Sequence, residues 1–269
     1  RVLFRSTMDI LGGAAISNGP RNLVAHAYIA TPIGITVEGA NIMTRTLIIF
    51  GQGALRAHPF AFREVNALEK GDLAGFDVAF WGHVGHVIRN IFRAVLLSVT
   101  RGWLSTPQGG PLARYYRKLS WTSATFATMA DIAMASLGGT LKSKEKITGR
   151  LGDILSWMYI GTSVLRRWEA DGKRKEDLPF VHYSMKHAMN EIQKAFDGLN
   201  SNMPVPFRVL GIIGKINPIG TMPSDRLGSK LAAKLMEKGE FRVNLTNEIY
   251  LPKDTKDGLG KLENAFQLA

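Results

Sequence analysis

The stretch ITGRLGDILSWMYIGTSVL, residues 147–165, decides the fold class. Its side chains follow the 3.6-residue period of an amphipathic α-helix, because one face recurs at steps of three and four residues. The residues on that face are Ile147, Leu151, Ile154, Leu155, Met158, Tyr159, Thr162 and Leu165. We therefore predict a long helix near 143–171.

Helical periods continue on both sides of this stretch, and strand signals are scarce. Two more long helices are predicted near 72–103 and 110–141, the first from the spacing of Phe76, Phe80, Val84, Val87, Ile91, Val95 and Val99. Shorter helices are predicted over 7–16, 22–30, 38–56, 60–70, 182–199, 224–238 and 257–268, with a loop over 31–37 and a short apolar segment over 206–213. The pattern indicates an all-α bundle with short connections.

The segment 119–141 has the length of a membrane span and contains a single charged residue, Asp131. It is, however, rich in serine, threonine and alanine, and a carboxylate near the middle of a bilayer is costly. Small residues at helical spacing suit close packing between helices. We expect a buried bundle helix here rather than a span.

Composition sets wider limits. The chain has 269 residues, of which 45% are apolar, so it is long enough for one large or two small globular domains. It has no cysteine, which excludes disulfides and thiolate chemistry. The net charge of +12 favours anionic partners such as nucleic acid, anionic lipid or phosphorylated cofactors. No dense lysine and arginine block with interleaved aromatics occurs, so basic residues spread over solvated helix faces are the simpler interpretation.

The chain begins with RVLFRS, residues 1–6, and not with methionine. The codons CGT GTG CTC TTC CGA TCT, which end a common sequencing adapter, encode the same six residues. We expect these six residues to be read-through from an adapter. On this interpretation the chain is the carboxy-terminal part of a longer protein.

One carboxylate stands among apolar and small residues in ITVEGANIMTR, residues 35–45. Glu38 in the first turn of a helix is favoured by the helix dipole, and this is the simplest reason for its position. Two further features accompany it. Asp9 precedes the pair Gly12-Gly13, which allows a backbone or ligand to approach closely, and Arg45 lies two helical turns after Glu38 on the same face.

These motifs resemble the carboxy-terminal helical domain of flavin-dependent acyl-CoA dehydrogenases. DILGG (9–13) resembles the family's Gln-Ile-x-Gly-Gly, and VEGANIMTR (37–45) resembles Tyr-Glu-Gly-Thr with an arginine seven residues after the glutamate. Further stretches resemble the long bacterial enzymes of fatty-acid β-oxidation, which carry an extra helical extension. These are GPRNLVAHAY (19–28), PIGITVEGANIMTRTLIIFGQGALRAHP (32–59), LGGTLKSKEKITGRLGDILS (137–156) and EDLPFVHY (176–183).

The resemblance covers nearly the whole chain after residue 6 and implies two parts. Residues 7–59 would end the helical domain of the dehydrogenase, and residues 60–269 would form the helical extension. Glu38 would be the base that removes the substrate α-proton, its backbone N–H would help hold the thioester oxygen, and Gly39 would line the substrate site. Arg45 would shape this segment rather than touch substrate.

The resemblance also implies FAD as cofactor and a homo-oligomer, because Asp9, Gly12 and Gly13 match a segment that approaches the flavin diphosphate of a neighbouring subunit. Several residues depart from the family pattern. Asp9 replaces a common glutamine, which places a negative charge near that diphosphate. Ala15 replaces a glycine. Ala40 and Ile42 replace a threonine and a glutamine, and both changes remove hydrogen bonds to the cofactor.

The implied reaction is the oxidation of acyl-CoA to trans-2-enoyl-CoA, with electrons passed to an electron-transfer flavoprotein or a similar acceptor. The enzyme would be cytoplasmic or peripheral at the inner membrane, and this chain alone would be inactive. An alternative function is an interaction module: residues 60–269 would bind an anionic membrane surface or a partner protein. A basic helical nucleic-acid binder is the weakest interpretation, and we expect no nucleic-acid partner.

Two smaller features have a structural and a functional interpretation. His83 and His86 share a helix face at a spacing that allows metal binding, but no carboxylate stands at a ligand spacing beside them. We expect a packing pair and no metal site. Asp153 is a polar residue in an otherwise apolar pattern, and it would pair either with Arg150 or with a neighbouring helix.

Overall fold

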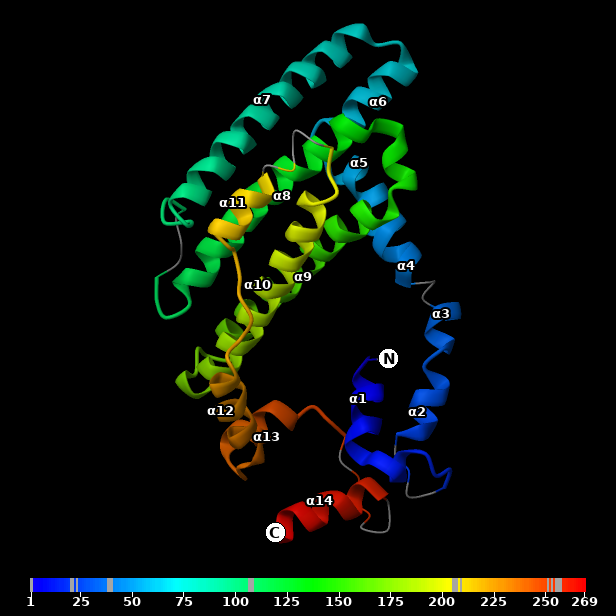
Figure 1. Cartoon of the computed structure of the whole chain (residues 1–269), viewed down its shortest axis with the longest axis vertical. Helices are drawn as coiled ribbons and strands as arrows, with labels where there is room; N and C mark the ends of the chain where they lie inside the picture. The colour runs from blue at the N-terminus through cyan, green and yellow to red at the C-terminus, as the bar shows by residue number, and fades with distance from the viewer. Residues whose placement is uncertain are drawn as a thin grey trace. The chain divides into compact units, whose positions relative to one another are not determined.

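The computed structural model describes residues 2–19, 22, 24–37, 41–105, 109–204, 208, 210–250, 252, 254 and 258–269. Its regular structure is helical, and no strand occurs in these ranges (Figure 1). The predicted all-α class is therefore confirmed. The chain divides into two compact units, one formed by Ile42–Leu231 and the other by Arg1–Asn41 together with Ala232–Ala269.

Long helices build the larger unit, and they confirm the predicted ones to within several residues. They are α7 (Leu73–Val99), α8 (Ala113–Leu137), α9 (Glu145–Ala170) and α10 (Leu178–Asn200). Helix α7 packs on α8, α8 packs on α9, and α9 packs along α10, while the shorter α6 (Ala61–Lys70) lies against α7 (Figure 1). Each long helix therefore packs against a long helix that is adjacent to it in the sequence.

The corner between α6 and α7 shows how local sequence sets these helices. Helix α6 ends at Gly71, whose φ of 68° is in the left-handed region that favours glycine. The next residue, Asp72, starts α7, because its carboxylate accepts a hydrogen bond from the Gly75 backbone N–H at 2.9 Å. A stop signal followed directly by a start signal produces a tight helical hairpin.

The core of this unit lies between α8, α9 and α10. Its fully buried side chains include Leu151, Ile154, Leu165, Met185, Met189, Ile192 and Leu199. Asp131 of α8 is 7% exposed, so the prediction of a buried helix over 119–141 is confirmed. In the described ranges, no helix combines the length and the apolar character that crossing a membrane would require.

The second unit contains shorter helices. They are α1 (Val2–Leu11), a 3-10 turn (Gly12–Ala15), α2 (Ala25–Ala30), α3 (Ile33–Val37), α13 (Glu240–Thr246) and α14 (Gly258–Leu268), while α11 (Leu210–Ile216) belongs to the larger unit and α12 (Asp225–Met236) crosses the division. The predicted loop over 31–37 is wrong, because α3 occupies most of it. Pro32 precedes α3 without breaking it, since proline is well tolerated where a helix begins and the first turn needs no N–H donor.

The segment from 41 to 57 is helical, but it is not the single α-helix that periodicity predicts. It consists of α4 (Asn41–Met43), the π-helix η2 (Thr44–Gln52) and α5 (Gly53–Ala57). A π-helix is rare and typically occurs near functional sites, because its wider turn shifts the side chains that follow. The buried face of η2 carries Thr46 and Phe50.

Helix α9 receives η2 at two glycines. A Cβ at Gly152 would lie 2.6 Å from the backbone oxygen of Arg45, and a Cβ at Gly149 would lie 3.2 Å from its guanidinium carbon. Real Cβ contacts are rarely this short. A side chain at Gly152 would meet backbone and push the two helices apart, whereas one at Gly149 would displace the Arg45 side chain. The glycines of α9 thus determine how closely the residues after Glu38 approach the bundle.

Replacing Gly152 with alanine should lower the free energy of unfolding by about 1–3 kcal/mol, because the added methyl group meets a backbone atom that cannot move aside. Urea denaturation of the 269-residue chain measures this change. Gly85→Ala in α7 is the matched control, since nothing lies within 4 Å of its Cβ position. That control should raise stability by about 0.5–1 kcal/mol, as alanine for glycine does in an open helix. Equal effects at the two positions would contradict the packing explanation.

Candidate functional site

The predicted base Glu38 and its neighbour Gly39 lie outside the described residues, so their roles stay predictions. The residues just before them belong to α3 and not to a loop. Ile33 and Val37, two apolar residues shortly before Glu38 in the sequence, are 67% and 75% exposed. The described part of the chain therefore leaves these two apolar side chains uncovered.

Arg45, two helical turns after Glu38, is held by Asp153 of α9. Its Nε donates to Asp153 Oδ1 at 2.5 Å, and its Nη2 donates to Oδ2, so the pair is bidentate. The hydrogen bond with Asp153 raises the pKa of Arg45. Of the two partners considered for Asp153, the structure has the neighbouring helix and not Arg150. Because both side chains are partly exposed, the pair contributes only about 0–1 kcal/mol to stability, and its main effect is orientation.

This contact joins residues that are 108 positions apart in the sequence, so periodicity alone could not find it. A signal does exist in the α9 sequence. Gly149 and Gly152 stand on one helix face and are followed at once by a lone carboxylate, Asp153. A notch of two glycines beside an acidic residue indicates a docking position for a helix that carries a basic residue.

The glycine pair near the beginning of the chain is open. Gly12 has a φ of +57°, which favours glycine, and nothing lies within 4 Å of a Cβ built on Gly12 or Gly13. Asp9 is exposed on α1 one turn before them. Asn22 secures the end of this turn, because its Nδ2 donates to the backbone oxygen of Ala15 at 2.5 Å. No neighbour in the described residues explains why position 13 lacks a side chain, so its backbone is free for an approaching group.

A cluster of histidines and carboxylates lies where α6, α7 and α8 meet. His83 Nδ1 is 2.8 Å from Glu64 Oε1, and His58 Nε2 is 3.3 Å from Asp131 Oδ1. The ligand atoms of His58, His86 and Asp131 lie within 4.8 Å of one another. No carboxylate stands at a ligand spacing beside His83 and His86 in the sequence, but the fold brings Glu64 and Asp131 to the cluster from other helices.

Hydrogen bonding decides what this cluster can bind. His58 Nδ1 accepts from the backbone N–H groups of Phe60 and Ala61 at 3.2 and 2.9 Å, and it therefore caps the start of α6. A neutral imidazole whose Nδ1 accepts must carry its proton on Nε2. That nitrogen faces Asp131 and has no lone pair for a metal ion. The arrangement favours a histidine paired with a carboxylate over a metal site.

Burial shifts both members of this pair away from their charged forms. It lowers the pKa of His58, with a smaller lowering from the nearby His83. It also lowers the pKa of His86. The pKa of Asp131 is raised by burial, although the nearby His83 and His86 oppose the rise. His58 and His86 thus resist proton uptake.

Comparison with known families decides the identity of the chain. Residues 55–269 match the family described as the carboxy-terminal domain of acyl-CoA dehydrogenase, bacterial type. The chain belongs to the acyl-CoA dehydrogenase family. No solved structure matches it. The resemblance first inferred from the motifs at 9–13 and 37–45 is therefore confirmed by a different part of the sequence.

The match places several features within a recognised domain of the acyl-CoA dehydrogenases. Asp153, the histidine cluster and all four long helices lie inside residues 55–269, whereas Glu38 and Arg45 precede them. The pair between Arg45 and Asp153 therefore links the predicted catalytic segment to the matched domain. The predicted domain boundary at 59–60 stays a prediction.

The burial of His58 beside Asp131 predicts how stability depends on pH. The unfolded chain takes up a proton at His58 below about pH 6.5, whereas the folded chain resists it. The free energy of unfolding is therefore larger above this pH and decreases as the pH falls. His58→Asn should make the loss between about pH 7.5 and 5.5 smaller, because an asparagine oxygen still caps α6 but does not titrate. Urea denaturation at several pH values measures the loss.

The control is His26→Asn, which replaces an exposed histidine in the other unit and should keep the pH dependence of the unmodified chain. If His58→Asn and His26→Asn lose the same free energy between the two pH values, the buried pair does not cause the dependence.

Proposed function

We propose that the chain is the carboxy-terminal part of an FAD-dependent enzyme that oxidises acyl-CoA to trans-2-enoyl-CoA in fatty-acid β-oxidation. Family membership supports the enzyme class. The sequence VEGAN (37–41), in which Glu38 is the one carboxylate, supports the site. The 269-residue chain alone should show no turnover, because the proposed substrate and flavin pockets need further domains.

The chemistry explains why one carboxylate is required. The α-proton of an acyl thioester is weakly acidic, so its removal needs a base held in a dry site with a raised pKa. The Glu38 carboxylate takes this proton, and the β-hydrogen leaves with its electron pair. FAD, when bound, supplies the acceptor for that hydride. The backbone N–H of Glu38 donates to the thioester oxygen as negative charge develops there, and Gly39 leaves room for the substrate beside it.

The open glycine turn fits a flavin diphosphate. Gly12 and Gly13 present an exposed backbone with no side chain in the way, as close approach of a phosphate group requires. Asp9 fits less well, because a carboxylate near a diphosphate is repulsive. We infer that Gly12 and Gly13 contact the cofactor of a neighbouring subunit in a homo-oligomer, with Asp9 as the weaker member of this cofactor-binding segment.

The contact between η2 and α9 supports the role of Glu38 indirectly. Arg45 and Asp153 fix the first turns of helix after residue 40, and the two glycines of α9 set their distance from the bundle. A general base needs a defined position, since small displacements of a catalytic group cost large factors in rate. The extension thus orders η2, the helical segment that follows the proposed base in the sequence. Electrons would leave to an electron-transfer flavoprotein or a similar acceptor, in the cytoplasm or at the inner membrane.

The decisive variant is Glu38→Gln in the full-length enzyme. With a long-chain acyl-CoA added anaerobically, the unmodified enzyme should lose its flavin absorbance, and the variant should bind substrate but reduce its flavin about 10²–10⁴ times more slowly. Stopped-flow absorbance measures both rates. Glu69→Gln, at an exposed position on α6, is the control and should behave as the unmodified enzyme. Equal bleaching in all three would show that another carboxylate is the base.

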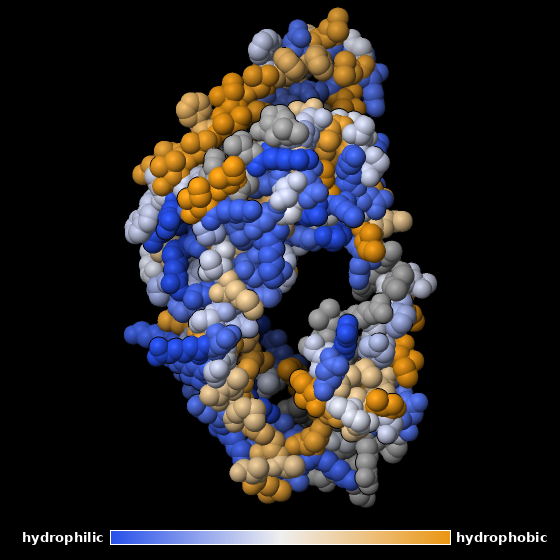
Figure 2. Space-filling view, viewed as in Figure 1, coloured by the Kyte–Doolittle hydropathy of each residue, from blue (hydrophilic) through white to orange (hydrophobic). Residues whose placement is uncertain are grey.

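A second candidate function belongs to α7. One stripe of this helix, spaced at alternate steps of three and four residues around Gly85, is between 52% and 79% exposed. The stripe consists of Val78, Trp81, Ile88, Phe92, Val95 and Val99. Figure 2 shows apolar side chains gathered along this helix. The predicted helix over 72–103 is confirmed, but its apolar residues occupy more than the face that packs on the bundle.

The chemistry of the stripe suits a lipid surface. Trp81 and Phe92 are aromatic residues of the kind that enter the headgroup region, and the exposed Arg89 and Arg93 lie beside them. Basic side chains next to an apolar face add attraction to anionic lipid. We propose that α7 lies in the surface of an anionic membrane and holds the enzyme there.

Phe92→Ser should weaken binding to phosphatidylglycerol vesicles about tenfold or more, because a large apolar side chain no longer leaves water. Co-sedimentation of the 269-residue chain measures the binding, with phosphatidylcholine vesicles as the uncharged comparison. The control is Tyr159→Ser, which removes a 75% exposed aromatic from α9 and should have no effect. If no vesicle binds and Phe92→Ser instead turns a dimer into a monomer, the stripe is a contact between subunits and the lipid proposal is wrong.

A further inference from the structure

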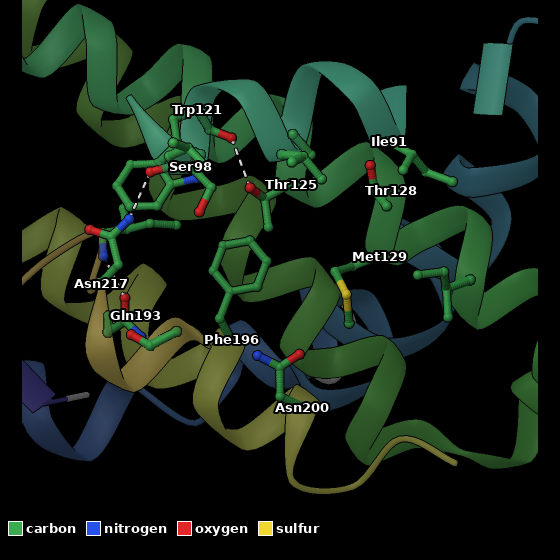
Figure 3. A pocket seen from close by; sticks show the side chains of 16 residues that line it. Ile91, Ser98, Trp121, Thr125, Thr128, Met129, Gln193, Phe196, Asn200 and Asn217 are labelled. Atoms are coloured by element: carbon green, nitrogen blue, oxygen red, sulfur yellow. Dashed lines mark hydrogen bonds between the residues drawn. The ribbon is translucent and has the colours of Figure 1, made fainter. Parts of the chain in front are cut away.

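A cavity of about 430 Å³ lies among α7, α8, α10 and α11 of the larger unit (Figure 3). Its walls are mainly apolar and include Ile91, Val95, Trp121, Met129, Phe196 and Ile219. None of the described residues that line it is charged. Ligand sites in proteins have volumes of about 300–1,000 Å³ and mostly apolar walls with a few polar groups. The cavity therefore has the size and lining of a binding site for an uncharged small molecule.

Most polar side chains of the cavity already have partners within the protein. The hydroxyls of Thr125 and Thr128 each donate to a backbone oxygen one turn earlier, at 3.0 Å. Asn217 Nδ2 donates to the Ser98 backbone oxygen at 2.7 Å, and Gln193 Oε1 accepts from the Ile219 backbone N–H at 2.7 Å. Each of these four side chains therefore has at least one hydrogen-bond partner within the protein.

Asn200 is different. It lies at the end of α10, is only 6% exposed, and lines the cavity next to Phe196 and Met129 (Figure 3). Its side-chain oxygen is buried and has no hydrogen-bond partner among the described residues. A buried amide without a partner destabilises the folded protein, and leucine of similar size would not. The described hydrogen bonds thus give this oxygen no structural role. A turn of the amide toward the cavity would let it accept a hydrogen bond from a molecule inside.

The cavity is also elongated. It follows α7 from Ile91 to Val99, which is about 12 Å at the rise of an α-helix. Val95 and Val99 at this wall are more than half exposed, so the opening of the cavity lies along α7. An elongated, mainly apolar space with one unpaired polar atom at its wall fits an extended hydrocarbon chain that enters with a polar end.

We propose that this cavity binds an uncharged amphiphile, a single hydrocarbon chain with one hydroxyl or amide N–H group that donates to the Asn200 side-chain oxygen. The apolar walls hold the chain, and Asn200 selects the end group. An ionised carboxylate is excluded, because the walls offer no charge to compensate for its lost hydration. This inference does not depend on the role of Glu38.

The test is calorimetric titration of the 269-residue chain with 1-decanol. The unmodified chain should bind it, and Asn200→Leu should bind it about fivefold more weakly, as expected for one lost hydrogen bond. The control Asn202→Leu changes an exposed asparagine two residues further on and should leave the affinity unchanged. Asn200→Leu without ligand should be at least as stable to urea as the unmodified chain, whereas a purely structural asparagine would make the variant less stable.

A second pair of variants tests the position. Val95→Trp places a large side chain at the opening and should abolish 1-decanol binding, while Val78→Trp makes the same change on the same helix outside the cavity and should not. Decanoate at neutral pH should bind about tenfold or more weakly than 1-decanol, because its charge must lose its hydration. The proposal is overturned if 1-decanol does not bind, if Asn200→Leu binds it equally well, if Val78→Trp alone abolishes binding, or if decanoate binds more tightly.

Discussion

The close contact of η2 with α9 is the constraint that fixes the helical segment after the predicted base. Two glycines let the backbone of Arg45 approach α9, and Asp153 then engages its guanidinium with both oxygens. The energy of this ion pair is small because both side chains are partly exposed. Its geometry matters more, since a bidentate pair over a glycine notch allows one arrangement of the segment that follows the predicted base. In this way α9 orders the helical segment with which the larger unit begins.

Several buried polar groups in the otherwise apolar bundle lack a full set of hydrogen bonds. Asp131 and His58 are buried together on α8 and at the start of α6, and Asn200 is buried at the end of α10. Each such group disfavours folding unless a partner compensates for its lost hydration. His58 and Asp131 compensate one another in part, and the backbone donors of α6 satisfy the second histidine nitrogen. Asn200 lacks such compensation within the described residues, which is why it points to a molecule from outside.

Helix α7 connects the two proposed lipid-related properties. Its stripe from Val78 to Val99 faces solvent, and the end of that stripe, at Val95 and Val99, also borders the cavity. A helix with apolar residues on more than one face buries one face against its own bundle and leaves the other for a different apolar environment. The same residues can therefore contact a membrane surface and line the entrance to an apolar site.

Much of this protein follows from its sequence alone. Apolar side chains at steps of three and four set the long helices, because a helix buries one face whatever its neighbours are, and the motifs at residues 9–13 and 37–45 are enough to indicate the family. Prediction from local sequence failed at two places. One is Pro32, since proline can either end a helix or begin one, and the other is a segment whose conformation is seen only in its contact with a distant helix. Pro32 precedes a helix instead of preventing one, and residues 44–52 wind as a π-helix against α9. The partners of Arg45, His83 and His58, and the cavity around Asn200, were decided only by the tertiary structure. They join side chains from separate helices, and a periodic pattern records which face of a helix is apolar but not which helix will cover it.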